Sequence, residues 1–153
     1  MKKARPSKRR SERSKPVDHE LLANFQFHLR HFLSFSEANT RKNGLTSQQY
    51  QALLTIRGLS TPHSSMSVRE LASFLLIDKD AAAGLVNRMA KVGLLTRSTD
   101  PDDGQRILIA LTRKGKQKLA SVAGANWREL GYRRLSLTKS LKIGTRTSNA
   151  RPN

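Results

Sequence analysis

Two short amphipathic patterns, followed at once by two short strand-like runs, occupy residues 67–112, and few folds accommodate that order. The first pattern opens with a capping box, because Ser67 and Glu70 can each accept a backbone N–H from the other residue. Apolar side chains then recur at helical spacing, at Val68, Leu71, Ala72 and Leu75. The spacing predicts a short helix that ends near residues 76–78.

A second helix is predicted directly after the first, with Asp78 as its N-cap and Gly93 as the left-handed residue that ends it. Its buried face is predicted to consist of Ala82, Leu85, Val86 and Met89. The remaining positions then point outward: Lys79, Asp80, Ala83, Gly84, Asn87, Arg88 and Lys91. This polar and basic outer face is the candidate functional surface.

A β-hairpin is predicted beyond Gly93. Residues 94–98 and 106–111 have strand composition, and the Asp-Pro-Asp-Asp-Gly sequence of residues 100–104 is strong turn chemistry. The same aspartates could suggest a cation loop, but the other ligand positions of an EF-hand are missing. A hairpin straight after a candidate recognition helix is a wing. The fold class is therefore mainly α with a small β-hairpin, in a winged helix-turn-helix arrangement.

The order of these residues resembles the MarR family of bacterial transcription regulators. The resemblance rests on a series of short pieces: Glu70-Leu71-Ala72, residues 84–89, Gly93-Leu94-Leu95, Arg97, Asp100-Pro101, Asp103, Arg106 and Leu111-Thr112-x-x-Gly115. Each piece is common alone, but the ordered series is specific, and flanking helices extend it over residues 21–141. The resemblance implies a homodimeric winged-helix regulator that binds double-stranded DNA, often as a repressor that responds to a small molecule.

Candidate DNA-contacting residues follow from the chemistry of the two elements. A helix fits the major groove, and a wing arginine can enter the minor groove or lie on phosphate. Arginine or lysine suits guanine, and asparagine suits adenine. The predicted DNA-binding residues are Lys79, Asp80, Gly84, Asn87, Arg88, Lys91, Arg97, Gln105 and Arg106. Without the resemblance, a solvated helix face with a salt-bridged arginine would account for the same pattern.

The chain departs from the family pattern at two places. Family members usually begin the recognition helix with basic or hydroxyl residues, whereas this chain has Asp80, which is either a specificity element or a sign of weaker binding. The wing tip of family members commonly carries paired arginines, whereas Gly104 and Gln105 stand before Arg106 here. Asp103 is a candidate partner for one of the remaining wing arginines in a structural ion pair.

A long helix is predicted over residues 17–43, with apolar residues on two faces. One stripe consists of Leu21, Leu22, Phe25, Leu29, Phe32 and Leu33, and a second set pairs Phe27 and Phe35 with His28 and His31. Two faces suit a helix that packs both on its own domain and on a partner subunit. No metal site is predicted, because zinc needs three or four ligands and nothing completes a set with the two histidines.

A helix that supports the reading head is predicted from the capping box at Thr46 to about Arg57, before a loop over residues 59–66. In the family this helix helps to wall the effector pocket. The candidate effector-binding residues are Phe25, His28, Phe32 and Tyr50, for a small aromatic or anionic ligand. Aromatic residues at helical spacing are also what a protein core requires.

Another helix is predicted to start at Thr112 and to run past Leu130. Lys114, Lys116 and Lys118 lie in its first turns, where either nearby phosphate or ordinary solvation accounts for them. A weak apolar pattern beyond Gly131 predicts only a short last helix. We therefore expect a disordered basic arm (1–16), a winged-helix domain (17–143) and a disordered tail (144–153). Within the domain, dimerisation helices (17–43 and 112–143) flank a DNA-binding core (46–111).

The net charge of +18 in 153 residues indicates a polyanionic partner. Residues 1–20 carry +5 and residues 128–153 carry +6, so the excess is concentrated at the two ends. The N-terminal arm is either a solubilising tail or a segment that tracks the phosphate backbone. A sequence-independent architectural protein that coats DNA with its basic arms is therefore the alternative to a specific regulator.

Other protein classes fit the sequence poorly. There are no cysteines, no long apolar run and no apolar signal segment, so we expect a cytoplasmic protein with no membrane partner. There is also no Gly-rich phosphate loop, no His-Glu-x-x-His motif and no recognisable triad. The sequence accordingly predicts neither an enzyme nor a bound cofactor or metal.

Overall fold

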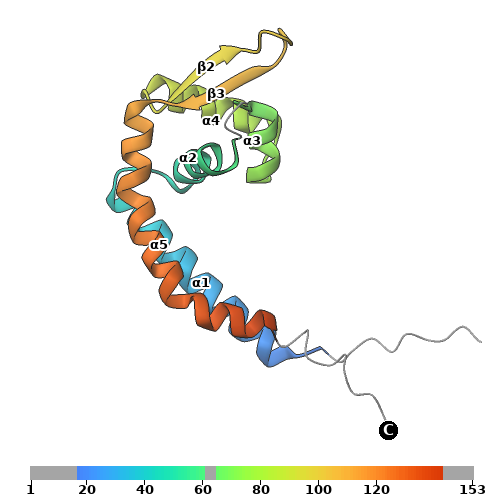
Figure 1. Cartoon of the computed structure of the whole chain (residues 1–153), viewed down its shortest axis with the longest axis vertical. Helices are drawn as coiled ribbons and strands as arrows, with labels where there is room; N and C mark the ends of the chain where they lie inside the picture. Colours follow the sequence, from blue (N-terminus) through green and yellow to red (C-terminus); the bar gives the residue numbers. More distant parts are fainter. Residues whose placement is uncertain (1–16, 61–64, 143–153) are drawn as a thin grey trace, which may run out of the picture.

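The computed structural model describes residues 17–60 and 65–142. The predicted arm (1–16) and tail (144–153) lie outside the described residues, as does part of the loop before Met66. The chain forms a head, which carries the hairpin, and a stalk of two long helices that run away from it (Figure 1). Among the described residues, no helix combines the length and apolar character needed to cross a bilayer.

The head is built from short helices packed under a small sheet. Its elements are α2 (Ser47–Leu59), β1 (Met66–Ser67), α3 (Val68–Leu75), α4 (Lys79–Lys91), β2 (Leu95–Thr99) and β3 (Ile107–Leu111). The strands are antiparallel in the order β1-β3-β2. The fold class predicted from the sequence is confirmed, with one difference: β1, in a segment predicted as loop, adds a third strand to the hairpin.

Short sequence motifs predict where most of the helices begin and end. Both capping boxes form, at Ser67 with Glu70 and at Thr46 with Gln49, and Gly93 adopts a φ of +74° just after α4. Asp78 occupies the N-cap position of α4 as predicted, but its side chain makes no capping hydrogen bond. The core of the head lies between α2, α3, α4, the sheet and the start of α5. Its most deeply buried side chains include Leu53, Leu71, Val86, Met89, Ile109 and Val122.

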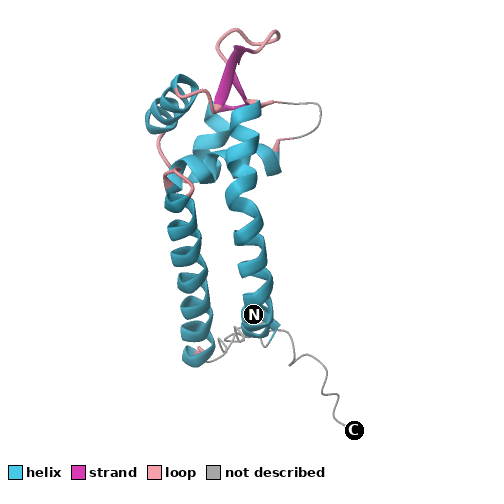
Figure 2. Cartoon of the chain, turned by 90° about the vertical axis from the view of Figure 1, so that its left-hand side faces the viewer, coloured by secondary structure: helices cyan, strands magenta, loops and turns pink. Residues whose placement is uncertain are grey.

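The stalk consists of α1 (His19–Lys42) and α5 (Arg113–Lys142), which extend together from the head (Figure 2). The expectation of a separate short helix beyond Gly131 is wrong, because α5 continues through this glycine. A glycine inside a helix costs only about 1 kcal/mol relative to alanine. Glu129 and Arg133 form an ion pair of 2.5 Å that spans the glycine and supports the helix on both sides of it.

Polar side chains join α1 to α5 inside the stalk. The Asn39 amide donates to the Val122 carbonyl at 3.1 Å and to Asn126 Oδ1 at 2.9 Å. Asn126 in turn donates to the Ser36 hydroxyl at 2.8 Å, and its residue is only 4% exposed. Because buried amides need partners, these bonds favour one register of the two helices.

We expect Asn126→Leu to destabilise the protein by about 1–3 kcal/mol, because it removes the amide that donates to the Ser36 hydroxyl and one of the two acceptors of the Asn39 amide. Urea unfolding followed by circular dichroism measures the change. Ala120→Leu, at an exposed position of the same helix, is the control and should stay within about 0.5 kcal/mol of the parent protein. Equal stability of parent and Asn126→Leu would show that the polar contacts contribute nothing.

Candidate nucleic-acid interface

The outward face of α4 carries polar and basic side chains clear of the core. Ala82, Leu85, Val86 and Met89 are buried, as the spacing predicted. Lys79, Asp80, Asn87, Arg88 and Lys91 are exposed, whereas Gly84 is half-buried. Within the described part of the chain, Lys79, Arg88 and Lys91 form no ion pair. Three positive charges on α4 are therefore free for an anionic partner.

A groove of about 540 Å³ opens between the start of α3, the outer face of α4 and the hairpin. It brings together five of the predicted DNA-binding residues: Lys79, Asn87, Arg97, Gln105 and Arg106. Asp80, Gly84, Arg88 and Lys91 do not line it and lie elsewhere on α4. The groove therefore lies between the wing and one edge of α4.

Arg97 lies on the inner face of the hairpin. In β2 it is two residues beyond buried Leu95 and pairs across the ladder with buried Ile109, so its side chain leaves the sheet on the side of α4. There its guanidinium donates a hydrogen bond to Asn87 Oδ1. The wing arginine expected to be free for DNA is thus already bonded to a side chain of α4.

Arg88 lies back over the preceding turn of α4. A Cβ added at Gly84 would come within 3.2 Å of the Arg88 guanidinium. Residues four apart share one helix face, so the missing side chain of Gly84 leaves the space that the guanidinium occupies. Gly84 therefore positions a neighbouring side chain, a role that the sequence pattern did not reveal.

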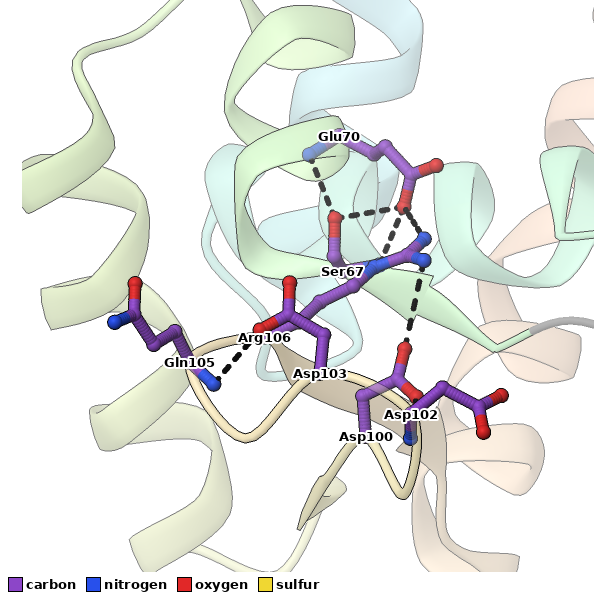
Figure 3. A network of polar contacts seen from close by, with 7 residues as sticks. All are labelled: Ser67, Glu70, Asp100, Asp102, Asp103, Gln105 and Arg106. Atoms are coloured by element: carbon purple, nitrogen blue, oxygen red, sulfur yellow. Dashed lines mark hydrogen bonds and ion pairs between the residues drawn. The ribbon is translucent and has the colours of Figure 1, made fainter.

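Arg106 is held by two carboxylates. Its guanidinium lies 3.1 Å from Glu70 and 3.5 Å from Asp100 (Figure 3). The expected Asp103 ion pair is wrong: Asp103 accepts from the Gln105 backbone N–H at 3.0 Å and so builds the turn. Glu70 is 36 residues from Arg106, and the sequence had shown it only as a capping residue. The wing tip is consequently acidic, with its arginine paired.

Glu70 has a pKa below its usual range. The Ser67 hydroxyl and backbone N–H both donate to its carboxylate at 2.7 Å, and the Arg106 guanidinium adds a weaker contribution of the same sign. Because the folded pKa is lower than the unfolded one, the ionised carboxylate stabilises the fold above about pH 4.5. This contribution is lost as the pH falls through the folded pKa.

We expect Glu70→Gln to lower the free energy of unfolding at about pH 7, and we expect a smaller difference from the parent protein at about pH 3, because the contribution of the carboxylate is lost as the pH falls through its lowered folded pKa. Urea unfolding at both pH values measures the difference. Glu37→Gln is the matched control, since the partner of Glu37 among the described residues is exposed Arg41 on the same helix. A stability difference that is independent of pH would contradict the assignment.

Two lysines of α5 have structural partners. Lys114 Nζ donates to the Val92 carbonyl at 2.7 Å, and Lys118 Nζ donates to the Asn43 carbonyl at 3.0 Å. These carbonyls follow α4 and α1, so the lysines place positive charge at two helix C-termini. These contacts account for the positions of Lys114 and Lys118, so neither a nearby phosphate nor solvation alone is needed to explain the two lysines.

The candidate effector-binding residues lie away from the groove. Tyr50 is buried in the core of the head, and Phe25, His28 and Phe32 lie half-buried along α1. His28 Nδ1 is buried, and no described residue forms a hydrogen bond with it. Their role as a ligand site stays a prediction.

The known proteins to which this chain is similar are transcriptional regulators. A family model for the MarR family matches residues 43–106. The chain is 28% identical over 134 residues to a protein of Thauera aromatica assigned as a transcriptional regulatory protein for the hcr operon, covering 84% of this chain and 78% of that protein. It is 31% identical over 86 residues to the organic hydroperoxide resistance transcriptional regulator of Bacillus subtilis, covering 54% and 56%.

A solved structure gives the same overall arrangement. A mutant of S. aureus MepR, bound to an oligodeoxyribonucleotide, superimposes with a TM-score of 0.60. The alignment covers 84% of this chain and 94% of that chain, at 15% sequence identity. At this identity the likeness concerns the fold, which is a head with a hairpin on a stalk of long helices.

Proposed function

Because the chain belongs to the MarR family of DNA-binding transcriptional regulators, we propose that it is a repressor that binds a pseudo-palindromic operator as a homodimer in the cytoplasm. The observation that carries the proposal is the outer face of α4, where Lys79, Arg88 and Lys91 stand exposed and unpaired among the described residues. The relatives are transcriptional regulators, and the chain is a regulator rather than an enzyme.

The homodimer proposal rests on apolar side chains that the single chain leaves exposed along its stalk. On α1 these include Leu22, Phe27, Leu33 and Phe35, and on α5 they include Trp127, Tyr132 and Leu135. Trp127 is 75% exposed and Leu135 is 67% exposed. Exposed apolar side chains along both helices of the stalk favour an interface, and a second copy of the stalk supplies a matching surface.

In the proposed complex the two α4 helices enter successive major grooves, about 34–36 Å apart. Such a dimer occludes the promoter, and repression follows from that occlusion. A ligand that binds one separation of the heads more tightly than another shifts the population toward it, and so alters DNA affinity.

We propose a small aromatic or anionic effector at the region of Phe25, His28, Phe32 and Tyr50. The support is His28 Nδ1, a buried polar atom that no described residue satisfies. An unsatisfied buried polar atom is costly, so a hydrogen-bonding group from a ligand or a partner subunit at this place stabilises the assembly. Calorimetric titration of the protein and of His28→Phe with aromatic carboxylates tests the site. Equal binding by both proteins would contradict it.

The test of specific DNA binding is a salt series. The purified protein should prefer its own upstream region over unrelated DNA by at least ~10³ at physiological salt, with a two-fold symmetric footprint. The charge of +18 favours the alternative, an architectural protein that binds any DNA. Equal affinity for both DNAs, falling together as salt rises, would support that alternative and contradict the regulator.

We expect Arg88→Ala to weaken operator binding about 10- to 100-fold, because it removes a charged donor from the outer face of α4. Fluorescence anisotropy with operator and unrelated DNA measures both affinities. Arg30→Ala is the matched control, since it removes the same charge from an exposed position on the stalk. Parent-like affinity and operator preference in Arg88→Ala would show that the reading face is assigned to the wrong residues.

A further inference from the structure

We propose that Arg97 is a positioning residue that fixes the amide of Asn87, and so determines which bases α4 accepts at one operator position. The inference rests on the proposed function, since it concerns the reading of an operator. It assigns Arg97 an indirect role in specificity in place of the direct DNA contact expected of a wing arginine.

The side chain of Arg97 extends from the hairpin toward α4. The residue stands on the face of β2 that carries Leu95 and lies opposite Ile109, and its guanidinium reaches Asn87 on α4. Both residues are exposed and line the groove between α4 and the hairpin. The contact therefore lies on the surface that would face DNA.

The chemistry of the contact determines the orientation of the Asn87 amide. A guanidinium has only donors, so the amide must turn its oxygen, Oδ1, toward Arg97. The opposite orientation would set N–H groups against N–H groups. With one lone pair of Oδ1 engaged and a guanidinium beside it, the two N–H donors of Nδ2 are the part of the amide that stays fully available to another partner.

Base recognition changes as a result. A free asparagine binds adenine through both ends of its amide, accepting from N6 and donating to N7. Asn87 instead presents donors, and the adjacent guanidinium disfavours the N6 amino group of adenine. Guanine, with acceptors at N7 and O6, and thymine, with an acceptor at O4, match this surface. We therefore expect guanine or thymine at the base that Asn87 contacts.

Selection of binding sites from a randomised DNA pool tests the inference, with competition binding on single-base operator variants. The parent protein should disfavour adenine at one position of each half-site by about 10-fold relative to guanine or thymine. Arg97→Met keeps a long side chain but releases the amide, so adenine should become favoured at that position alone. Arg97→Lys still donates to Oδ1 and should keep the parent preference.

Asn87→Asp gives a second, independent variant. The carboxylate can still pair with Arg97 but has no outward N–H, so the preference for guanine or thymine should disappear while the fold is retained. Circular dichroism verifies the fold of each variant. An Arg97→Met protein with unchanged preference at every position would overturn the inference while leaving the regulator intact.

Two other outcomes are also decisive. If Arg97→Met weakens binding to all sequences equally and lowers the salt dependence, Arg97 contacts phosphate and the positioning role is wrong. If the parent protein selects no sequence at all, the proposed function fails, and this inference fails with it.

Discussion

Gly115→Ala is expected to destabilise the protein by about 3 kcal/mol, the upper end of the usual cost of overpacking and a large part of the stability of a typical domain. A Cβ at residue 115 would lie 2.2 Å from the Leu94 carbonyl oxygen and 3.2 Å from its carbon. That carbonyl cannot move away easily, because it also accepts the Thr112 backbone N–H at 3.1 Å. The first turn of α5 and the segment between α4 and β2 would therefore be forced apart.

Urea unfolding measures the change in stability. A second glycine of α5 gives a control substitution that is expected to raise the stability. At Gly124 the nearest atom to an added Cβ is the flexible end of Arg128, at 3.8 Å. Gly124→Ala should therefore stabilise the protein by about 0.4–1 kcal/mol. Similar unfolding midpoints for the two variants would show that the close approach at Leu94 is not real.

The double variant Trp127→Glu, Leu135→Glu is expected to be monomeric and to bind the operator at least about 100-fold more weakly. Both side chains are among the most exposed apolar groups of α5, so the monomer loses little packing when they are replaced. In the proposed homodimer two linked heads bind as one molecule, and separating them removes the effective concentration that the second head provides. Analytical ultracentrifugation and anisotropy measure the two effects.

A matched control carries the same change on another surface. Leu54→Glu with Leu59→Glu alters two exposed leucines of α2, and we expect this protein to stay dimeric. A stalk variant that remains a dimer would contradict the proposed interface. A stalk variant that becomes a monomer with full operator affinity would instead contradict the role of the dimer in DNA binding.

Signals confined to a few neighbouring residues predicted the fold well. The capping boxes at Thr46 and Ser67 and the positive φ of Gly93 each depend on atoms within one turn of chain. The apolar spacing of α4 also predicted its buried face, because a helix repeats every 3.6 residues. The sequence did not predict β1, whose partner strand is more than 40 residues away, or the continuation of α5 through Gly131, which is supported by pairing with α1 and by the Glu129–Arg133 ion pair.

The candidate site was harder to predict, because its contacts join residues far apart in the chain. Arg106 pairs with Glu70 at a separation of 36 residues, and a sequence alone does not show which carboxylate a given arginine reaches. The inward direction of Arg97 could have been inferred from its two-residue offset from buried Leu95. Its partner Asn87 could not, because the choice depends on how the hairpin lies across α4.

The unbroken α5 makes the stalk a lever arm for the head. Thirty residues at the helical rise give it a length of about 45 Å. The N-terminal end of α5 is rigidly connected to the head, since Gly115 packs directly on the Leu94 backbone. A rotation of α5 by about 10° about its C-terminal end thus displaces the head by about 8 Å. For comparison, successive major grooves of DNA are about 34 Å apart. In the proposed homodimer, a rotation of about 10° between the two stalks would therefore move the heads out of register with the grooves of DNA, with no rearrangement inside either head.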